Sequence, residues 1–351
     1  MEKKALGKIE AVRSFLRPAF ADILPVAYTI SGTQPVRRQP QHTKRKHAGL
    51  LPTRRFLMVT ALAAIMFAVA VIVTPTPALR AQESVEQVRA AAEKGDVVAL
   101  THLGDFYRIG NGMSQDHVQA VRCYRLAADK GYAPAQINLG AMYHLGLGVP
   151  RNDAEAARWF AGPARQGHDV AQFMLAQLYR DGAGVPQDLP EAVRLFELAA
   201  KQGMGSAKES LGIMYYQGLG VAQDYGKAME LLRPQAESGS PNAQYHVGLM
   251  YKLGQGVAQD SRKAADWMAK AADWGLVPAQ LEYAALLRDG EGVQRDDAQA
   301  YKWFTIAAER GEKEHKAKAQ AGQAQVRKLL SAEQASAIQA DAATWLAQHG
   351  R

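Results

Sequence analysis

Residues 240–275 read SPNAQYHVGLMYKLGQGVAQDSRKAADWMAKAADWG, and this 36-residue stretch decides the fold. In its first third, apolar side chains fall at Ala243, Val247, Met250 and Tyr251. This spacing places them on one face of a helix with 3.6 residues per turn. The sequence therefore predicts an amphipathic helix at the start of the segment.

The rest of the segment predicts a turn and a second helix. A Gly-Gln-Gly triplet at 254–256 ends the first helix, because Gly reaches the positive φ that a tight turn needs. Asp260 or Ser261 can cap a second helix, which carries Trp267 on its apolar face and ends at Gly275. The 36 residues together predict one helical hairpin.

The same pattern occurs six times in succession with no insertion or deletion. Every unit has Ala at its fourth, twenty-fifth and thirty-third places and Gly at its fifteenth, seventeenth and last places. A fixed period of this length is typical of units that stack and bury one another's apolar faces. The six units are residues 96–131, 132–167, 168–203, 204–239, 240–275 and 276–311.

Segments on either side of the repeats are predicted to cap the stack, since terminal units must present a polar outer face. Residues 82–95 look like the second half of a unit and are expected to form an N-capping helix. Residues 312–351 are expected to form C-capping helices. Within them, Ser331 and Gln334 have the spacing of a capping box that starts the last helix.

The consensus AQ(x)2LG(x)2Y(x)2GxGV(x)2D(x)3A(x)7AA(x)2G is nearly complete in residues 135–167 and 243–275. It resembles the Sel-one-like repeat (SLR) family, a relative of the tetratricopeptide repeat, over residues 96–311. The resemblance implies an all-α fold, a right-handed α–α superhelix of helical hairpins. It also implies a protein-interaction scaffold, although a fold does not name a partner.

Two kinds of departure from the consensus stand out. The sixth unit replaces the Leu-Gly pair with Tyr283 and Ala284. The second and fourth units carry Pro163 and Pro234 inside the second helix. An interior proline removes a backbone hydrogen bond at a cost of about 3 kcal/mol, so local bends are expected at these two places.

Charge is distributed unevenly along the chain. The formal net charge is +8, but residues 1–81 hold 13 Lys/Arg against 3 Asp/Glu, a net charge of about +10. The remaining 270 residues hold 29 Lys/Arg against 31 Asp/Glu, about −2. The repeats therefore offer little to a polyphosphate backbone, and no nucleic-acid partner is expected.

The N-terminal region predicts an export or anchoring signal. Residues 1–55 are basic and predicted to be disordered, and residues 56–73, FLMVTALAAIMFAVAVIV, carry no charge. This run lies between the 7–15 apolar residues of a cleaved signal peptide and the roughly 20 of a membrane-spanning helix. Both interpretations stay open, with residues 74–81 as a linker.

The position of the positive charges predicts the topology. They precede the apolar run, so residues 1–55 are expected in the cytoplasm and the repeats outside it. The two interpretations then give two locations. The chain is either anchored in the inner membrane with periplasmic repeats, or periplasmic or secreted after cleavage of the leader.

No catalytic, cofactor or metal motif is present in the sequence. There is no HExxH, no G-x-S-x-G and no phosphate-binding loop, and the Gly-x-Gly triplets are turns rather than a dinucleotide fingerprint. The lone Cys123 occupies the twenty-eighth place of its unit and is predicted to be a core residue. Recurring carboxylates at the twenty-first place are predicted helix caps: Asp188, Asp224, Asp260 and Asp296.

The resemblance to tetratricopeptide arrays implies that the first helices line the concave side, with the sixth, tenth and thirteenth places turned inward. The hypothesis is a groove with an apolar and aromatic floor and a basic stripe, which clamps an extended or helical peptide with acidic groups. Alternatively, the cations only complement helix dipoles and stay solvated. The candidate partner-binding residues are Arg108, Ile137, His144, Phe173, Arg180, Tyr216, Tyr245, Lys252 and Arg288.

These observations favour a non-enzymatic adaptor that is exposed in the bacterial cell envelope and binds a peptide or protein. The alternative is a glycan- or peptidoglycan-associated envelope factor, for which Trp159, Trp267 and Trp303 are the aromatic candidates. A third hypothesis is a hydrolase. That activity would require a compact cluster of titratable side chains in a cleft, which the spacing does not predict.

Overall fold

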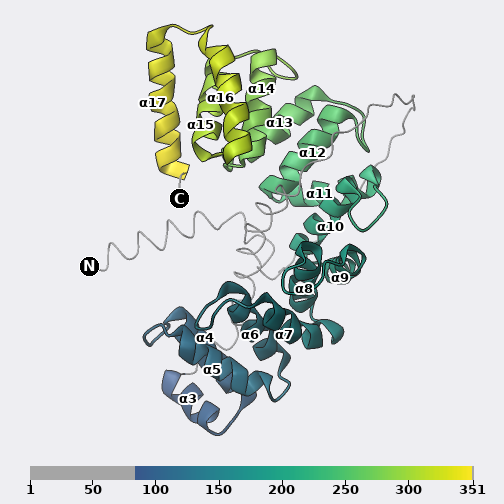
Figure 1. The fold of residues 1–351 in the computed structure, drawn as a ribbon, viewed down its shortest axis with the longest axis vertical. Helices are drawn as coiled ribbons and strands as arrows, with labels where there is room; N and C mark the ends of the chain where they lie inside the picture. The colour runs from purple at the N-terminus through teal and green to yellow at the C-terminus, as the bar shows by residue number, and fades with distance from the viewer. Residues whose placement is uncertain (1–83, 350–351) are drawn as a thin grey trace, which may run out of the picture. The chain divides into compact units, whose positions relative to one another are not determined.

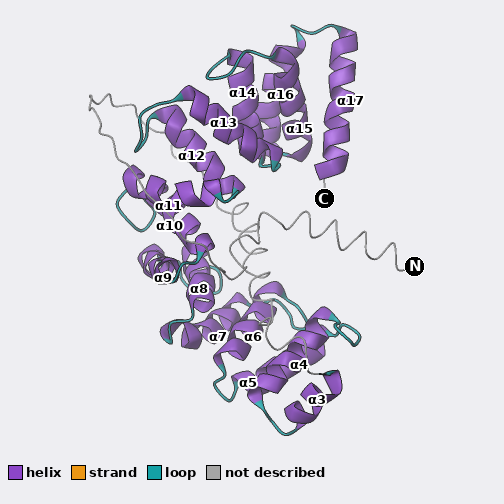
Figure 2. Ribbon diagram, turned by 180° about the vertical axis from the view of Figure 1, so that it is seen from behind, coloured by secondary structure: helices purple, strands orange, loops and turns teal. Residues whose placement is uncertain are grey.

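The structure is a computed structural model, and it describes residues 84–349. Over this range the chain forms fifteen helices, α3 to α17, and no strand (Figures 1 and 2). The all-α class predicted from the period is confirmed. The predicted disordered segment 1–55, the apolar segment 56–73 and the linker 74–81 lie outside the described residues.

Each repeat is a hairpin of two helices of nearly equal length. The first helices are α4 (Val97–Ile109), α6 (Ala133–Leu145), α8 (Asp169–Asp181), α10 (Gly205–Gln217), α12 (Pro241–Leu253) and α14 (Val277–Asp289). The second helices are α5 (His117–Ala128), α7 (Asp153–Arg165), α9 (Leu189–Lys201), α11 (Tyr225–Glu237), α13 (Ser261–Asp273) and α15 (Asp297–Arg310). Each second helix packs on its own first helix and on the first helix of the next unit, which makes the array a solenoid.

The residue at the twenty-first place starts every second helix. The Asp260 side chain accepts a hydrogen bond of 3.1 Å from the backbone N–H of Lys263, and Asp188 accepts one of 3.0 Å from Glu191. These bonds satisfy amide groups that the first helical turn leaves unpaired. The N-cap role predicted for this column of carboxylates is confirmed, and in the second unit Asn152 takes it.

The glycine at the seventeenth place connects neighbouring units. Gly256 has φ +72°, and a Cβ there would lie 2.5 Å from the carbonyl oxygen of Tyr225, the first residue of α11. The loop of one unit therefore rests directly on the start of the second helix in the unit before. Only glycine combines this backbone conformation with so close an approach.

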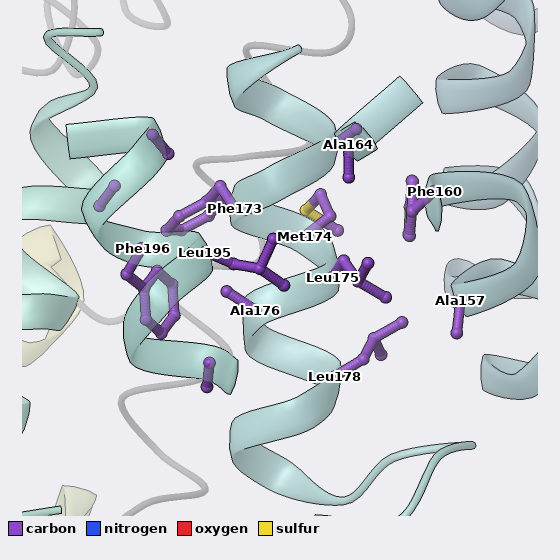
Figure 3. Packing of buried hydrophobic residues seen from close by; sticks show 14 of the residues in the cluster. Ala157, Phe160, Ala164, Phe173, Met174, Leu175, Ala176, Leu178, Leu195 and Phe196 are labelled. Atoms are coloured by element: carbon purple, nitrogen blue, oxygen red, sulfur yellow. The ribbon is translucent and has the colours of Figure 1, made fainter. Parts of the chain in front are cut away.

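The core is formed by small residues alternating with large ones. Figure 3 shows α8 in the middle of the array, with Phe173 on the side of Leu195 and Phe196 from α9. Phe160 of α7 lies on the opposite side. The alanines of the fourth and twenty-fifth places are almost all inaccessible to solvent and let the helices approach closely: Ala120, Ala135, Ala156, Ala171, Ala192, Ala207, Ala228, Ala243, Ala264, Ala279 and Ala300.

A glutamine at the fifth place joins consecutive hairpins. Its side-chain amide donates to the backbone carbonyl of the alanine eight residues earlier, at the end of the preceding second helix. The bonds are 3.1–3.2 Å long and link Gln136 to Ala128, Gln172 to Ala164, Gln244 to Ala236 and Gln280 to Ala272. The fourth unit has Lys208 at this place.

Single helices lie at both ends of the repeats. At the front, α3 (Val85–Glu93) packs on α4 and begins with a capping box between Ser84 and Gln87. At the back, α16 (Lys313–Arg327) packs on α15 and α14, while α17 (Ala332–His349) packs on α15. The predicted capping box at the start of α17 is confirmed, with reciprocal bonds of 2.9 and 3.1 Å between Ser331 and Gln334.

Two further sequence predictions bear on the fold. Cys123 is 7% exposed and packs in the core, as predicted. Pro163 and Pro234 lie inside α7 and α11, which keep the 13-residue length of α9 and α13 despite the missing N–H groups. Across residues 84–349, no helix combines the length and apolar character needed to cross a membrane.

Candidate partner-binding face of the first helices

The candidate site is the first-helix face, which we define as the side chains at the sixth, tenth and thirteenth places of the six units. Its basic column does not carry unbalanced charge. Each Lys or Arg at the thirteenth place lies within 3.2 Å of a carboxylate oxygen, in the pairs Arg108–Asp105, Arg180–Asp181, Lys252–Glu282 and Arg288–Asp289. His144 Nδ1 lies 2.6 Å from Asp153 Oδ1. The predicted stripe is therefore neutralised by acidic neighbours within the chain.

The first of these pairs belongs to a buried network. The hydroxyl of Tyr124 donates to Asp105 Oδ1 at 2.8 Å, and Arg108 Nε donates to the same hydroxyl at 3.0 Å. Burial, reinforced by the Asp105 carboxylate, raises the pKa of Tyr124 well above its ordinary value. Asp105 and Arg108 thus connect α4 to α5, and their contacts are structural.

Two later arginines of the column differ in exposure. Arg180 is 8% exposed, and Nε and a terminal guanidinium nitrogen donate to the two oxygens of Asp181 at 2.8 and 3.0 Å. Arg288 is more exposed, binds Asp289 in the same way, and reaches Gln325 of α16 at 2.9 Å. The Arg288 guanidinium also lowers the pKa of Asp289. Both arginines are held in fixed two-point geometry.

The apolar residues predicted to form the floor of the binding groove are largely part of the hydrophobic core. Ile137 is 8% exposed and Phe173 is 1% exposed. The ring of Phe173 lies 5.6 Å from that of Phe196 on α9, in a tilted arrangement (Figure 3). These two side chains stabilise the packing of the first helices on the second helices.

Two predicted residues from different repeats contact the same histidine. Tyr216 of α10 and Tyr245 of α12 both place their rings edge-on to His246, at centroid distances of 5.3 and 5.4 Å. Tyr216 also contacts Tyr225 of α11 at 5.5 Å. Burial raises the pKa of Tyr216 to about 12, so its hydroxyl stays protonated and can donate a hydrogen bond. Sequence reasoning did not single out His246.

An ion pair between repeats lies beside these rings. Lys252 Nζ of α12 is 2.6 Å from Glu282 Oε2 of α14, and both side chains remain partly exposed. The Glu282 carboxylate adds to the effect of burial in raising the pKa of Tyr245. We call Tyr216, Tyr245, His246, Lys252 and Glu282 the aromatic–ionic cluster. Tyr216, Tyr245 and Lys252 belong to the first-helix face, and His246 and Glu282, both at the seventh place, lie next to it. In this cluster several repeats contribute polar and aromatic groups together.

A carboxyl group at the sixth place of the fourth unit lies next to this cluster. Glu209 Oε2 accepts a 2.5 Å hydrogen bond from the hydroxyl of Ser240, the N-cap of α12. Loss of hydration raises the pKa of Glu209, although the bonds from Ser240 and Asn242 act in the opposite direction. The pKa of His246 is lowered, again because of burial. Both groups therefore favour their uncharged forms.

The tenth place holds one unusual side chain. Gln177 of α8 is 3% exposed, and neither its amide nitrogen nor its amide oxygen has a hydrogen-bond partner in the structure. Most buried polar side-chain atoms in proteins are bonded. The other residues of this column are Asp105, Ala141, Ile213, Leu249 and Ala285. Gln177 stands at the tenth place, one of the three places that the sequence predicted to face inward. That its amide lacks hydrogen-bond partners is seen only in the structure.

Groups that bind metals or stack on sugars are a separate feature of the described residues. In the part of the chain that the structure describes, no three or more His, Cys, Asp or Glu side chains gather to hold a metal ion. Of the tryptophans at the twenty-eighth place, Trp303 is 6% exposed, Trp159 is partly buried, and Trp267 lies under Lys270 Nζ at 4.2 Å. All three side chains are at least partly buried.

The geometry defines a class: an all-α repeat solenoid that presents the same three positions of each first helix along one face. The chain belongs to the Sel1 repeat family. The Sel1 repeat model matches six segments, at residues 97–132, 133–168, 169–204, 206–240, 241–275 and 277–312. Proteins of this family are generally protein-interaction scaffolds.

Two solved structures are similar to this chain. A protective antigen present in uropathogenic Escherichia coli strains, which displays an SLR fold, is 34% identical, with a TM-score of 0.63. The match covers 77% of this chain and 56% of that one, so the chain spans little more than half of that relative. A Sel1 repeat protein from Oxalobacter formigenes is 30% identical over 65% of this chain and 100% of that one, with a TM-score of 0.55. No curated protein matches the chain.

Proposed function

We propose that this chain is a non-enzymatic adaptor, exposed in the cell envelope, that binds a peptide or protein partner on its first-helix face. One observation carries the proposal. Six first helices of equal length present equivalent positions in succession, and the aromatic–ionic cluster gathers side chains from three of these helices. Aromatic residues beside partly exposed charges are typical of the residues that dominate protein interfaces.

The placement in the envelope is supported by the sequence of the leader. The uncharged run at residues 56–73 follows a basic segment, and this order directs the following domain out of the cytoplasm. The choice between a retained anchor and a cleaved signal remains part of the proposal. Mass analysis of the mature N-terminus, together with protease access to the repeats in intact spheroplasts, tests both the cleavage and the side of the membrane.

Site-specific photo-crosslinking tests the binding face. A photoreactive phenylalanine analogue replaces Tyr216 in the aromatic–ionic cluster, and a matched variant carries it at Arg122, which is exposed on α5. We expect a discrete protein adduct in living cells from position 216 and none from position 122. Equal labelling from the two positions, or none from either, would contradict binding at the first-helix face.

A glycan partner is the alternative that the same experiment separates. Sugar recognition would use exposed aromatic rings, whereas the tryptophans of the repeated column are partly or fully buried. One ring outside that column, Trp274 at the end of α13, is 44% exposed and is the candidate for sugar stacking. Retention of the protein on purified peptidoglycan, with no protein adduct from position 216, would support the glycan alternative.

A further inference from the structure

We propose that Gln177 is the residue of the first-helix face that recognises a peptide backbone, and that the partner segment is extended and uncharged. The inference rests on the proposed function and specifies the chemistry of its ligand. It starts from a side chain that is 3% exposed and whose amide nitrogen and oxygen both lack a partner. Leaving these groups unpaired destabilises the free chain, and a ligand that pairs them recovers the loss.

The chemistry of the carboxamide selects the ligand. It offers two N–H donors and one carbonyl acceptor, which together match the carbonyl and N–H of a peptide unit. An anion would use only the donors, and a cation only the acceptor. A backbone amide satisfies both sides at once, so the arrangement favours a peptide in an extended conformation, whose backbone groups are free to pair.

The surroundings of Gln177 favour an uncharged segment. Ile213 and Leu249, which are only partly buried, occupy the equivalent place in the next two units. Arg180, one turn after, has its guanidinium bound to both oxygens of Asp181. With this charge balanced inside the chain, an acidic ligand gains little from it, whereas apolar side chains can pack on the neighbouring residues.

Burial of the amide has a kinetic consequence. Because Gln177 is covered in the free chain, a ligand reaches it only after neighbouring side chains have moved. Association that requires such an opening is slower than the usual range of about 10⁵–10⁷ M⁻¹s⁻¹ for specific docking. We expect slow association, and an affinity that changes by less than about threefold when salt is raised, because no net charge is paired across the contact.

The test uses the full chain and a random library of phage-displayed peptides about twelve residues long as the probe. The tightest selected peptide is synthesised and measured against wild type, Gln177→Leu and Gln299→Leu. Leu is close to Gln in size and removes all its hydrogen bonds, while Gln299 is exposed on α15 and serves as the matched control. We expect Gln177→Leu to weaken binding by about tenfold or more and Gln299→Leu to leave it unchanged.

A second measurement identifies the backbone as the recognised group. Each backbone nitrogen of the peptide is methylated in turn, which removes one donor. One such peptide should lose about tenfold in affinity for wild type but lose nothing further for Gln177→Leu, since both changes remove the same bond. Independent, additive losses would overturn the inference, as would steep salt dependence.

The outcomes separate the inference from the proposed function. If peptides bind wild type and Gln177→Leu equally, Gln177 has no recognition role. In that case, an adduct at position 216 would still support the first-helix face as the binding site. If no peptide is selected but that adduct forms, the partner is a folded protein, and the inference is wrong. If neither peptide nor adduct is found, both are wrong.

Discussion

The backbone of Gly292 lies directly on the carbonyl of Ser261, so that a Cβ at position 292 would overlap the Ser261 oxygen. Ser261 is the first residue of α13, and Gly292 belongs to the loop of the following unit. The same contact recurs along the array, for example between Gly256 and Tyr225. The seventeenth place therefore fixes the distance between neighbouring hairpins.

This contact predicts an unequal effect of alanine at two glycines that share a positive φ. Gly292 has φ +73° and touches the backbone of the preceding unit, whereas Gly203 has φ +95° and nothing within 4 Å of its Cβ position. Gly203→Ala should cost only the conformational strain, about 1–2 kcal/mol of unfolding free energy. Gly292→Ala adds the overlap and should cost about 3 kcal/mol or more.

Urea unfolding followed by circular dichroism measures both glycine variants. Gly203→Ala is the control, because it changes the same residue type at a positive φ without a clash. Equal losses in the two variants would show that the contact with Ser261 does not set the spacing of the hairpins.

The glutamine column predicts one loss and one gain of stability. Gln280 is fully buried and donates to the Ala272 carbonyl at 3.2 Å, so Gln280→Leu should cost about 1 kcal/mol. The fourth unit has Lys208 at the equivalent place, and Lys208→Gln should complete the column and stabilise the chain by about 0.5–1.5 kcal/mol.

Thermal unfolding of the two variants beside wild type measures these changes. Gln299→Leu, on an exposed position of α15, controls for the loss of a glutamine as such. A stabilised Gln280→Leu, or a Lys208→Gln that melts below wild type, would contradict the role assigned to the column.

Because the thiol of Cys123 is buried, we predict that it does not react with thiol reagents in the folded chain. Burial raises the pKa of Cys123 to about 11, so almost no thiolate forms near pH 8. We expect a thiol-reactive disulfide reagent to leave the folded chain unmodified and to label one group per chain in denaturant. Rapid labelling of the folded chain at pH 8 would show that α5 opens readily, or that the thiol is not part of the core.

Much of the fold follows from local sequence. The caps and turns depend on residues close together in the chain, such as Asp260 bonding to the N–H of Lys263, and a period of 36 extends each assignment to every unit. The prolines are a partial exception. Pro163 lies two residues before the end of α7, and the helix continues through it although proline has no N–H to donate to the carbonyl four residues earlier.

The candidate site was harder to predict, because its properties depend on which side chains meet. The sequence identified the cations of the thirteenth place, but not that Lys252 would pair with Glu282 of the next unit or Arg180 with its own neighbour. Such pairings depend on rotamers and packing. One pattern in the sequence could have predicted a contact between units. Glutamine recurs at the fifth place in four units, which indicates a structural hydrogen bond.

A buried histidine and a partly buried glutamate have opposite effects on stability as pH falls. Burial lowers the pKa of His246 below its ordinary value of 6.5, so the unfolded chain binds a proton before the folded chain does. The contribution of His246 to the unfolding free energy is therefore present above pH 6.5. It is lost as pH falls below 6.5 toward the lower pKa of the folded chain. Glu209 has a raised pKa, so protonation of the folded state stabilises the chain as pH falls toward 4.5.

Two variants separate these contributions. His246→Phe keeps a ring between Tyr216 and Tyr245 but cannot titrate, and Glu209→Gln keeps an acceptor for Ser240 without a charge. Between pH 7.5 and 5.5, His246→Phe should lose less unfolding free energy than wild type. As pH falls further toward 4.5, Glu209→Gln should lack the stabilisation that wild type gains from protonation of Glu209. Identical pH profiles for wild type and His246→Phe would mean that His246 is hydrated in solution, because only desolvation separates its folded and unfolded pKa values in this direction.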